Sequence, residues 1–434
     1  MSESNGVGIP SVSNDAMLAE VVAEITDRLN AGDNIDLAAY AARCPGREEQ
    51  LKALVEALCL VERAGSSPPN AYGDEPAPEA LGDFRIIREV GRGGMGVVYE
   101  AEQLSLGRRV ALKVLPYAAT MDPRHLQRFR NEARAAASLH HEHIVPVHAV
   151  GNERGVHFIA MQFIEGVTLA QVIRELHSPT TPANTGDPTG EFIPAAGTSS
   201  TLAAAGLSTE NGRRGLEFYR SVAKLMIQAA KALEHAHSMG VVHRDVKPGN
   251  LMIDSSGKLW VTDFGLARFG TDADLTMSGD FVGTLRYMSP EQALAHHGLV
   301  DHRTDVYALG ATMYELLTGK PAVSGEDKQE ILRQIAFEEL VAPRQGDNSI
   351  PADLEVIVLK ALEKTPEDRY ATAQELAEDL RRHLENRPIA ARRPSMLQRM
   401  RKWARRNKGP LLAATIVFGA LVAGLVGTSL ALLD

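Results

Sequence analysis

Two short motifs constrain this chain more than any other part of its sequence. Residues 243–250 read His-Arg-Asp-Val-Lys-Pro-Gly-Asn, and residues 263–265 read Asp-Phe-Gly, eighteen positions after Asp245. A carboxylate can orient a hydroxyl group, oxygen ligands hold hard cations, and an ammonium neutralises phosphate. These are the groups that phosphoryl transfer from a metal–nucleotide complex requires. The two motifs supply them at four positions: Asp245, Lys247, Asn250 and Asp263. Either motif alone is a weak signal, but both in this order and at this separation are a strong one.

A glycine-rich run lies upstream of these motifs, where residues 91–98 read Gly-Arg-Gly-Gly-Met-Gly-Val-Val. Dinucleotide-binding folds use a similar run, but there a helix begins at the third glycine. Here residues 97–102 alternate like a strand. We therefore predict a strand-turn-strand flap, whose glycines let backbone N–H groups approach phosphate oxygens without a Cβ in the way.

Lys113 ends a strand-like run that begins at Val110, and this places an ammonium near the same phosphates. Glu132 lies nineteen residues further on, in a helical pattern, where it could pair with Lys113 and fix its position. A solvated surface glutamate is the alternative interpretation of Glu132.

The pattern of apolar and polar residues from residue 84 onward predicts an α+β fold. Short β-like runs occupy residues 84–90, 97–102, 110–115, 147–150 and 157–163, with one helical stretch over 123–139. After Leu216 helical patterns dominate, with a short strand-like segment on either side of Asp254. A β-rich piece followed by an α-rich piece suggests two lobes with a cleft between them.

Taken together, these residues resemble the signature set of the protein kinases, from residue 84 to about residue 384. The resemblance implies a bilobal kinase domain over 84–387, with a β-rich N-lobe and an α-rich C-lobe. It also implies ATP as phosphate donor and Mg²⁺ as cofactor, with Mn²⁺ as a substitute. By resemblance, the flap over the nucleotide consists of Gly91, Arg92, Gly93, Gly94, Met95, Gly96, Val97 and Val98. The adenine would lie against Ala111 and a hinge formed by Met161, Gln162, Phe163 and Ile164, with Met161 as gatekeeper.

The remaining roles follow from the resemblance position by position. Lys113 would bind the α- and β-phosphates and Glu132 would orient it. Asp245 would accept the proton of the substrate hydroxyl, Lys247 would contact the γ-phosphate, and Asn250 and Asp263 would bind the metal. The place of Lys247, two residues after Asp245, resembles serine/threonine rather than tyrosine kinases. Supporting roles fall to Thr284 beside the substrate, to Asp305 as a brace for the catalytic loop, and to an ion pair between Glu291 and Arg369.

Arg244 places a cation, expected to be buried, beside the catalytic loop. Such an arrangement usually requires a phosphate on the activation loop to neutralise and order it. The candidate phosphosites are Thr271, Thr276 and Ser278, and we expect autophosphorylation there. The implied activity is transfer of phosphate to serine or threonine hydroxyls of proteins whose identity the sequence does not reveal. The alternatives are a membrane-tethered pseudokinase scaffold and a small-molecule kinase of similar fold.

The sequence outside the kinase-like region divides by composition. Residues 1–14 are polar and predicted to be disordered, 15–64 read as a helical accessory module, and 65–83 form a proline-rich linker. Within the kinase-like region, residues 178–215 are rich in Thr, Ser, Ala, Gly and Pro, which predicts a disordered insertion. The start of the chain lacks the apolar core of a signal peptide.

The C-terminal part of the sequence predicts a membrane anchor. Residues 411–433 are 23 uncharged residues, about 34 Å as a helix, and a buried core helix rarely stays uncharged for that length. They follow a basic juxtamembrane segment, 388–410, which suits anionic lipid. The positive-inside rule then predicts a single-pass protein of the inner membrane with a cytoplasmic kinase domain. Small residues four apart, Ala420 with Gly424 and Ala423 with Gly427, leave open a homodimer through the span.

Charge and metal-ligating residues exclude other classes of function. The formal net charge of −9 argues against a nucleic-acid partner. The two cysteines, Cys44 and Cys59, are interpreted as reduced thiols rather than a disulfide. His140, His141, His143 and His148 fall in one turn, with no cysteine nearby, and we predict no metal site there.

Overall fold

The structure is a computed structural model. It describes residues 80–93, 96–115, 133–134, 136–153, 155–177, 204–207, 214–264, 283–294, 300–325 and 327–392, together with Val21, Glu24, Ile25, Tyr40, Arg43 and Thr201. Several sequence predictions therefore lie outside the described residues: the flap tip at Gly94 and Met95, Glu132, the phosphosites Thr271, Thr276 and Ser278, and the predicted span 411–433.

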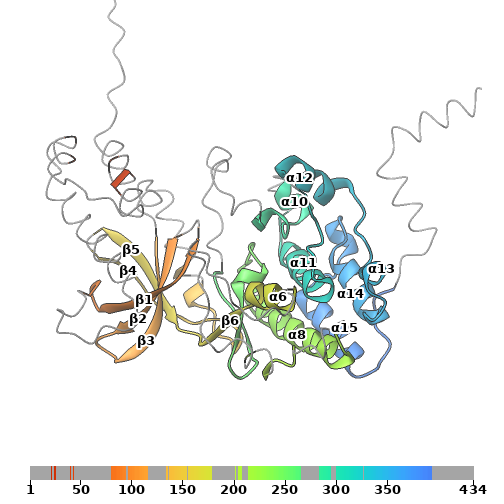
Figure 1. The fold of residues 1–434 in the computed structure, drawn as a ribbon, viewed down its shortest axis with the longest axis horizontal. Helices are drawn as coiled ribbons and strands as arrows, with labels where there is room; N and C mark the ends of the chain where they lie inside the picture. The colour runs from red at the N-terminus through yellow and green to blue at the C-terminus, as the bar shows by residue number, and fades with distance from the viewer. Residues whose placement is uncertain are drawn as a thin grey trace, which may run out of the picture. The chain divides into compact units, whose positions relative to one another are not determined.

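The N-terminal lobe is a five-stranded antiparallel sheet, shown in orange and yellow in Figure 1. Its strands lie in the order β1-β2-β3-β5-β4. They are β1 (Phe84–Gly93), β2 (Gly96–Gln103), β3 (Arg108–Val114), β4 (Val147–Glu153) and β5 (Val156–Gln162). Each coincides with a β-like run expected from the sequence, although β3 and β5 end one residue before the runs predicted over 110–115 and 157–163. β-branched and aromatic residues favour a pleated surface that is partly buried. Of the helical pattern predicted over 123–139, residues 133–134 and 136–137 are helical, and the described residues 138 and 139 lie beyond the helix end.

The C-terminal lobe is mainly helical, as the sequence predicts. Its longest described helix, α8 (Leu216–Ser238), buries Phe218, Val222, Met226, Ala229 and Leu233 at the three- and four-residue spacing of one helix face. That face packs against two other helices, α11 (Arg303–Thr318) and α15 (Ala373–Leu384). α11 also packs on α14 (Ala352–Ala361), where Gly310 allows close approach: a Cβ there would lie 2.8 Å from that of Ala361.

Shorter elements complete this lobe around a small second sheet of order β6-β7-β8. Its strands are β6 (Gly166–Thr168), β7 (Leu251–Asp254) and β8 (Leu259–Val261), the last two being the strand-like segments expected around Asp254. The remaining helices and helical turns are α6 (Leu169–His177), η1 (Pro248–Asn250), α10 (Pro290–Ala293), α12 (Lys328–Phe337), α13 (Pro343–Gly346) and η3 (Pro366–Asp368).

Backbone contacts join the two lobes behind the site. Residues 163–165 connect β5 directly to β6. The segment before β4 also pairs with β8: Val145 N donates to Val261 O at 2.9 Å, and Val261 N donates to His143 O at 2.8 Å. Functional groups from both lobes are therefore held around one region of the fold.

A few residues are described within two segments that were assigned by composition. Thr201 and Leu207, inside the segment expected to be a disordered insertion, are almost fully buried, and Gly206 lies against the side chain of Ser221 on α8. Leu81, inside the expected linker, is buried and exchanges two backbone hydrogen bonds with Phe84. Amino-acid composition is an average over a segment, so it does not detect a few apolar residues that are buried within a mainly polar one.

The structure describes only a few residues of the predicted N-terminal helical module. Val21 and Ile25 are buried and helical, and the Tyr40 hydroxyl donates to Glu24 at 2.9 Å. Within the described ranges, no helix has both the length and the apolar character needed to cross a membrane. The chain divides into two compact units, residues 1–388 and 389–434, and the site described below lies in the first.

Candidate active site

The flap is a hairpin of β1 and β2, which confirms the expected strand-turn-strand geometry. Gly91 pairs with Val98, and Gly93 pairs with Gly96 at the end of the ladder. Gly96 has φ +129°, and a Cβ there would collide with the carbonyl oxygen of Val114 on β3. Only glycine meets both requirements at this position.

Lys113 points from β3 to the start of the Asp-Phe-Gly motif. Its register partners are Val98 on β2 and Ile159 on β5, so it lies in the centre of the sheet. Its Nζ lies 2.8 Å from Oδ1 of Asp263, and the residue is only 6% exposed. The partner expected from the sequence was Glu132, which lies outside the described residues.

The expected hinge residues end β5 and begin the connection to β6. Met161 is the register partner of Ala111 on β3, so the proposed gatekeeper and adenine-contacting residue face each other across the ladder. Phe163 has the guanidinium of Arg109 over its ring, 4.6 Å from the centroid. A pocket lies beside Met161, lined by Ala133, Ala136, Ile144, Val145, Val147, Ile159, Met161, Thr262, Asp263 and Phe264. Met161 and Asp263 thus line the same, largely apolar recess.

The catalytic-loop residues converge on the carboxylate of Asp245. The Nδ2 group of Asn250 donates both to the backbone oxygen of Asp245 at 2.8 Å and to its Oδ2 at 2.9 Å. Lys247 Nζ lies 2.9 Å from the same Oδ2 and donates to Thr284 Oγ1 at 3.2 Å. The structure thus brings together Asp245, Lys247, Asn250 and Thr284, as the sequence predicts.

Asp305 braces this loop from α11, as expected. Its carboxylate accepts hydrogen bonds from the backbone N–H groups of His243 (2.8 Å) and Arg244 (2.7 Å), and lies 2.7 Å from His237 Nε2. The residue has no exposed surface. Hydrogen bonds to a buried charge are stronger than neutral ones, so they hold the backbone just before Asp245 in one conformation.

Two site residues that are not glycine have left-handed backbone conformations. Arg244 has φ 66° and Asp263 has φ 60°. Such residues are rare and cluster at functional sites, where the surrounding contacts hold them. The side chain of Arg244 is exposed, so the expectation of a buried cation is wrong. The described structure holds Arg244 through its backbone N–H, which donates to Asp305, and not through its side-chain charge.

The sequence did not single out His243, which is fully buried and links the two motifs. Its Nε2 lies 2.9 Å from the carbonyl oxygen of Thr262, and its ring centroid lies 4.6 Å from that of Phe264. His243 therefore connects the backbone before Asp245 to the residues on either side of Asp263. Its place in the motif is visible in the sequence, but its contacts are not.

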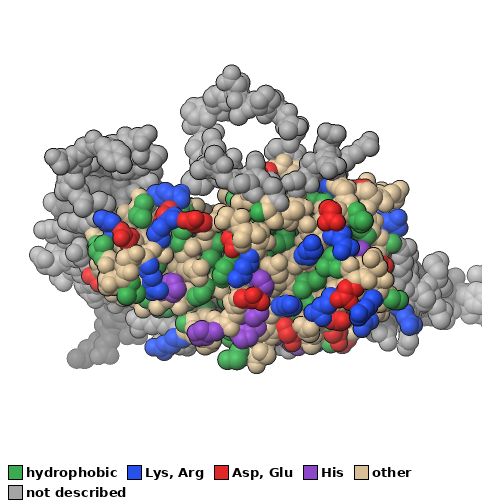
Figure 2. Space-filling model, turned by 90° about the horizontal axis from the view of Figure 1, so that it is seen from below, with side chains coloured by type: hydrophobic (Ala, Val, Ile, Leu, Met, Phe, Trp, Pro, Cys, Tyr) green, Lys and Arg blue, Asp and Glu red, His purple; other side chains and the backbone are tan. Residues whose placement is uncertain are grey.

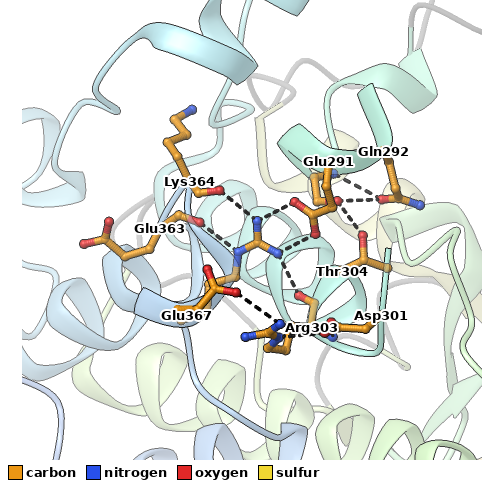
Figure 3. Close-up of polar contacts among 10 residues, drawn as sticks. Glu291, Gln292, Asp301, Arg303, Thr304, Glu363, Lys364 and Glu367 are labelled. Carbon is orange, nitrogen blue, oxygen red and sulfur yellow. Dashed lines mark hydrogen bonds and ion pairs between the residues drawn. The ribbon is translucent and has the colours of Figure 1, made fainter. Parts of the chain in front are cut away.

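The expected pair of Glu291 and Arg369 is confirmed and fully enclosed. Two hydrogen bonds of 2.7 Å join the guanidinium to the carboxylate. Arg369 also donates to the backbone oxygens of Arg303, Glu363 and Lys364. Figure 3 shows this network, with Glu291, Arg303, Glu363 and Lys364 labelled. Burial by itself raises the pKa of Glu291, but the hydrogen bonds and charge of Arg369 outweigh it and hold that pKa below its ordinary value. The pair fixes the end of the 283–291 segment to the C-lobe.

Histidine side chains gather on one face of the molecule (Figure 2). The rings of His141 and His235 stack with centroids 5.3 Å apart, and His143 lies 5.6 Å from His141. Burial, followed by the charge of neighbouring histidines, lowers the pKa of His141. Within the described part of the chain, no group of three or more His, Cys, Asp or Glu has the arrangement of a metal site.

Comparison with known proteins identifies the class to which this fold and site belong. The model of the protein kinase domain family matches residues 84–380. The chain therefore belongs to the protein kinase family.

Particular relatives share this domain. The chain is 34% identical over 300 residues to the serine/threonine-protein kinase PrkC of Bacillus subtilis, covering 69% of this chain and 40% of PrkC. It is 36% identical over 310 residues to the serine/threonine-protein kinase PknB of Mycobacterium tuberculosis, covering 70% of this chain and 43% of PknB. Among solved structures, the kinase domain of M. tuberculosis PknI matches with a TM-score of 0.51 and 25% identity, over 72% of this chain and 99% of that domain. The chain thus spans less than half the length of these two curated relatives.

Proposed function

We propose that this chain is a serine/threonine protein kinase that transfers the γ-phosphate of ATP to hydroxyl groups of proteins. One observation carries the proposal. The carboxylate of Asp245 is held by Asn250 and Lys247, while Lys113 from the other lobe reaches Asp263. The names of the relatives PrkC and PknB support serine/threonine specificity, and so does the lysine two residues after Asp245.

In this proposal Asp245 accepts the proton of the substrate hydroxyl as the hydroxyl oxygen bonds to the γ-phosphorus of ATP. The bond from that phosphorus to the bridging oxygen breaks, and ADP leaves. Lys247 contacts both the Asp245 carboxylate and the Thr284 hydroxyl. Its ammonium is therefore near the position where negative charge moves during transfer, and it would stabilise that charge. Thr284 would hold the substrate backbone or hydroxyl beside Asp245. Lys113 would neutralise the α- and β-phosphates beneath the glycine flap.

The donor set fits a hard divalent cation. Both amide hydrogen bonds of Asn250 are donated by its Nδ2 group to Asp245, so the amide oxygen of Asn250 is turned the other way. Together with the carboxylate of Asp263, it offers the oxygen ligands that Mg²⁺ prefers, and Mn²⁺ would accept them too. When bound, the cation would neutralise phosphate charge. The protein's own part is to hold these oxygens, Asp263 in its left-handed conformation.

The decisive experiment measures transfer of labelled γ-phosphate from Mg-ATP by the full chain, beside the Asp245→Asn variant, on itself and on a generic basic protein. We expect label on serine or threonine with the wild type and none with the variant. Nucleotide binding without transfer in either protein would instead favour the pseudokinase scaffold, because a scaffold keeps the fold but not the chemistry.

Activation and membrane attachment are further parts of the proposal. Autophosphorylation at Thr276 or Ser278 would switch the enzyme on, and residues 411–433 would anchor it in the inner membrane, leaving the kinase domain in the cytoplasm. Unchanged specific activity in a Thr276→Ala, Ser278→Ala double variant would refute the first. Recovery of the full chain in the soluble fraction after membranes are sedimented would refute the second.

A further inference from the structure

The backbone around Asp245 is held at three successive polar groups. The N–H group of Arg244 donates to Asp305 at 2.7 Å, and the N–H group of Asp245 donates to Nδ1 of His243 at 3.3 Å. Between them, the carbonyl oxygen of Arg244 accepts a hydrogen bond from Nε2 of Gln292 at 2.9 Å. This carbonyl belongs to the planar peptide group that joins Arg244 to Asp245, so Gln292 contacts the rigid unit that ends at the Cα atom of Asp245.

The side-chain amide of Gln292 has one orientation that satisfies its neighbours. Gln292 lies on α10, and its Oε1 accepts from the N–H group of Ser289 at 3.2 Å and from the Ser289 hydroxyl at 3.1 Å. Reversing the amide would place its oxygen against the carbonyl oxygen of Arg244 and its NH₂ group against the N–H group of Ser289. The half-buried side chain is therefore fixed with its donor group toward the catalytic loop.

The other end of this network is anchored on α11. The Ser289 hydroxyl is hydrogen bonded to the hydroxyl of Thr304, and neither residue has exposed surface. Gln292 and Thr304, both labelled in Figure 3, lie on α10 and α11. Thr304 precedes Asp305 in the first turn of α11, and Asp305 holds the N–H group of Arg244 directly. Arg244, at φ 66°, is thus tied to one turn of α11 through both of its backbone polar groups.

We infer that Gln292 is a positioning residue for phosphate transfer, whose amide holds the peptide group before Asp245 in the orientation that directs the carboxylate to the substrate hydroxyl. A left-handed conformation at a residue other than glycine persists only while surrounding contacts hold it. Without the donor on Gln292 the peptide group can rotate, and the carboxylate spends less time in the productive geometry. Lys113, proposed to bind ATP, belongs to β3 of the other lobe, so the loss falls on kcat. This inference rests on the proposed kinase function and adds to it a residue that acts through Asp245.

The test measures kcat, the KM for ATP and the melting temperature of the full chain and two variants, with a generic basic protein as substrate. Gln292→Glu keeps the length of the side chain and its capping bonds with Ser289, but it presents an oxygen to the Arg244 carbonyl. We expect kcat to fall about tenfold, with the KM for ATP within about twofold and the melting temperature within about 2 °C. Gln292→Met removes the donor without adding a charge and should lower kcat about threefold to tenfold.

The matched control is Gln334→Glu on α12, where the amide makes the same two kinds of contact. Its Nε2 donates to the carbonyl oxygen of Ser324 at 2.7 Å, and its Oε1 accepts from the N–H group of Ser324 at 3.1 Å. This control should leave kcat unchanged.

Three results would overturn the inference alone while the wild type still transfers phosphate. They are an unchanged kcat in both Gln292 variants, an equal fall in Gln334→Glu, and a fall that disappears when rates are divided by the folded fraction. Absence of transfer by the wild type, both to itself and to the basic protein, would overturn the proposed function as well.

Discussion

Replacing Arg369 with alanine would test the buried ion pair that Arg369 forms with Glu291. The substitution removes two 2.7 Å hydrogen bonds to Glu291 and leaves that carboxylate enclosed, at 4% exposure, without its counterion. Breaking a buried pair from one side typically costs about 3–5 kcal/mol. The carbonyl oxygens of Glu363 and Lys364 also lose their donor, which places the expected loss near the upper end.

The assay is urea unfolding followed by tryptophan fluorescence, with the thermal midpoint as a second measure. At about 2–4 °C per kcal/mol, a loss of about 5 kcal/mol lowers the midpoint by about 10–20 °C. Arg369→Lys keeps the charge but not the planar fork, so we expect a loss of about half that size. In a cycle with Glu291→Ala, the double variant should lose much less than the sum of the two single variants, because the pair acts as a unit.

The same pair predicts the direction of a pH effect. The folded pKa of Glu291 lies below its ordinary value, so its stabilising contribution is complete above about pH 4.3 and is lost as pH falls through the lower folded pKa. The stability difference between wild type and Glu291→Gln should therefore be constant near neutrality and shrink only in acid. A loss under about 1 kcal/mol for Arg369→Ala, or additive losses in the cycle, would refute the reasoning.

Three further substitutions test the site. Lys113→Met removes the cation that reaches Asp263 and should lower kcat/KM in a peptide-phosphorylation assay by about 10²-fold or more. Asp305→Ala leaves two loop N–H groups without their acceptor; it should lower kcat at least about tenfold and stability by about 2–4 kcal/mol, read from initial rates and urea unfolding. Arg109→Ala removes the cation over the hinge ring and should raise KM for ATP about threefold to tenfold with little change in the peptide KM. Arg85→Ala, which breaks an exposed pair on the same sheet with Glu102, is its control and should change neither constant.

Much of the fold was predictable, because its strongest signals are local. The runs that became β1, β2, β3 and β5 carry strand-like residues between turns, and the periodic spacing in α8 marks one buried face. The grouping of Lys247 and Asn250 around the carboxylate of Asp245 was also predictable, since Asn250 lies only five positions after Asp245. Residues this close in sequence can take up few relative positions, whatever the backbone conformation.

Contacts between residues far apart in the sequence were predictable only where the resemblance to the protein kinases implied them. The pair of Glu291 and Arg369 came from resemblance, not from spacing, because its members are 78 residues apart. Nothing local indicates that Lys113 contacts Asp263, 150 residues away, or that Leu207 packs inside a polar insertion. The prediction that the Arg244 side chain is buried was wrong. Its neighbours His243 and Asp245 are buried, but Arg244 has a left-handed backbone conformation and its side chain is exposed.

The backbone conformations explain why the site resists local prediction. Among the described residues, three that are not glycine have positive φ: Arg244, Asp263 and Asn386. Asn386 follows the end of α15, where a left-handed residue commonly ends a helix and asparagine is well suited to it. The other two flank the proposed chemistry and have no such local reason. Arg244 is held by Asp305 through its backbone N–H, and Asp263 by the ion pair with Lys113. Each of the two residues therefore depends on a contact with a distant part of the chain. Arg244 is held from α11 in its own lobe, whereas Asp263 is contacted from β3 in the N-terminal lobe, so only the geometry around Asp263 requires both lobes.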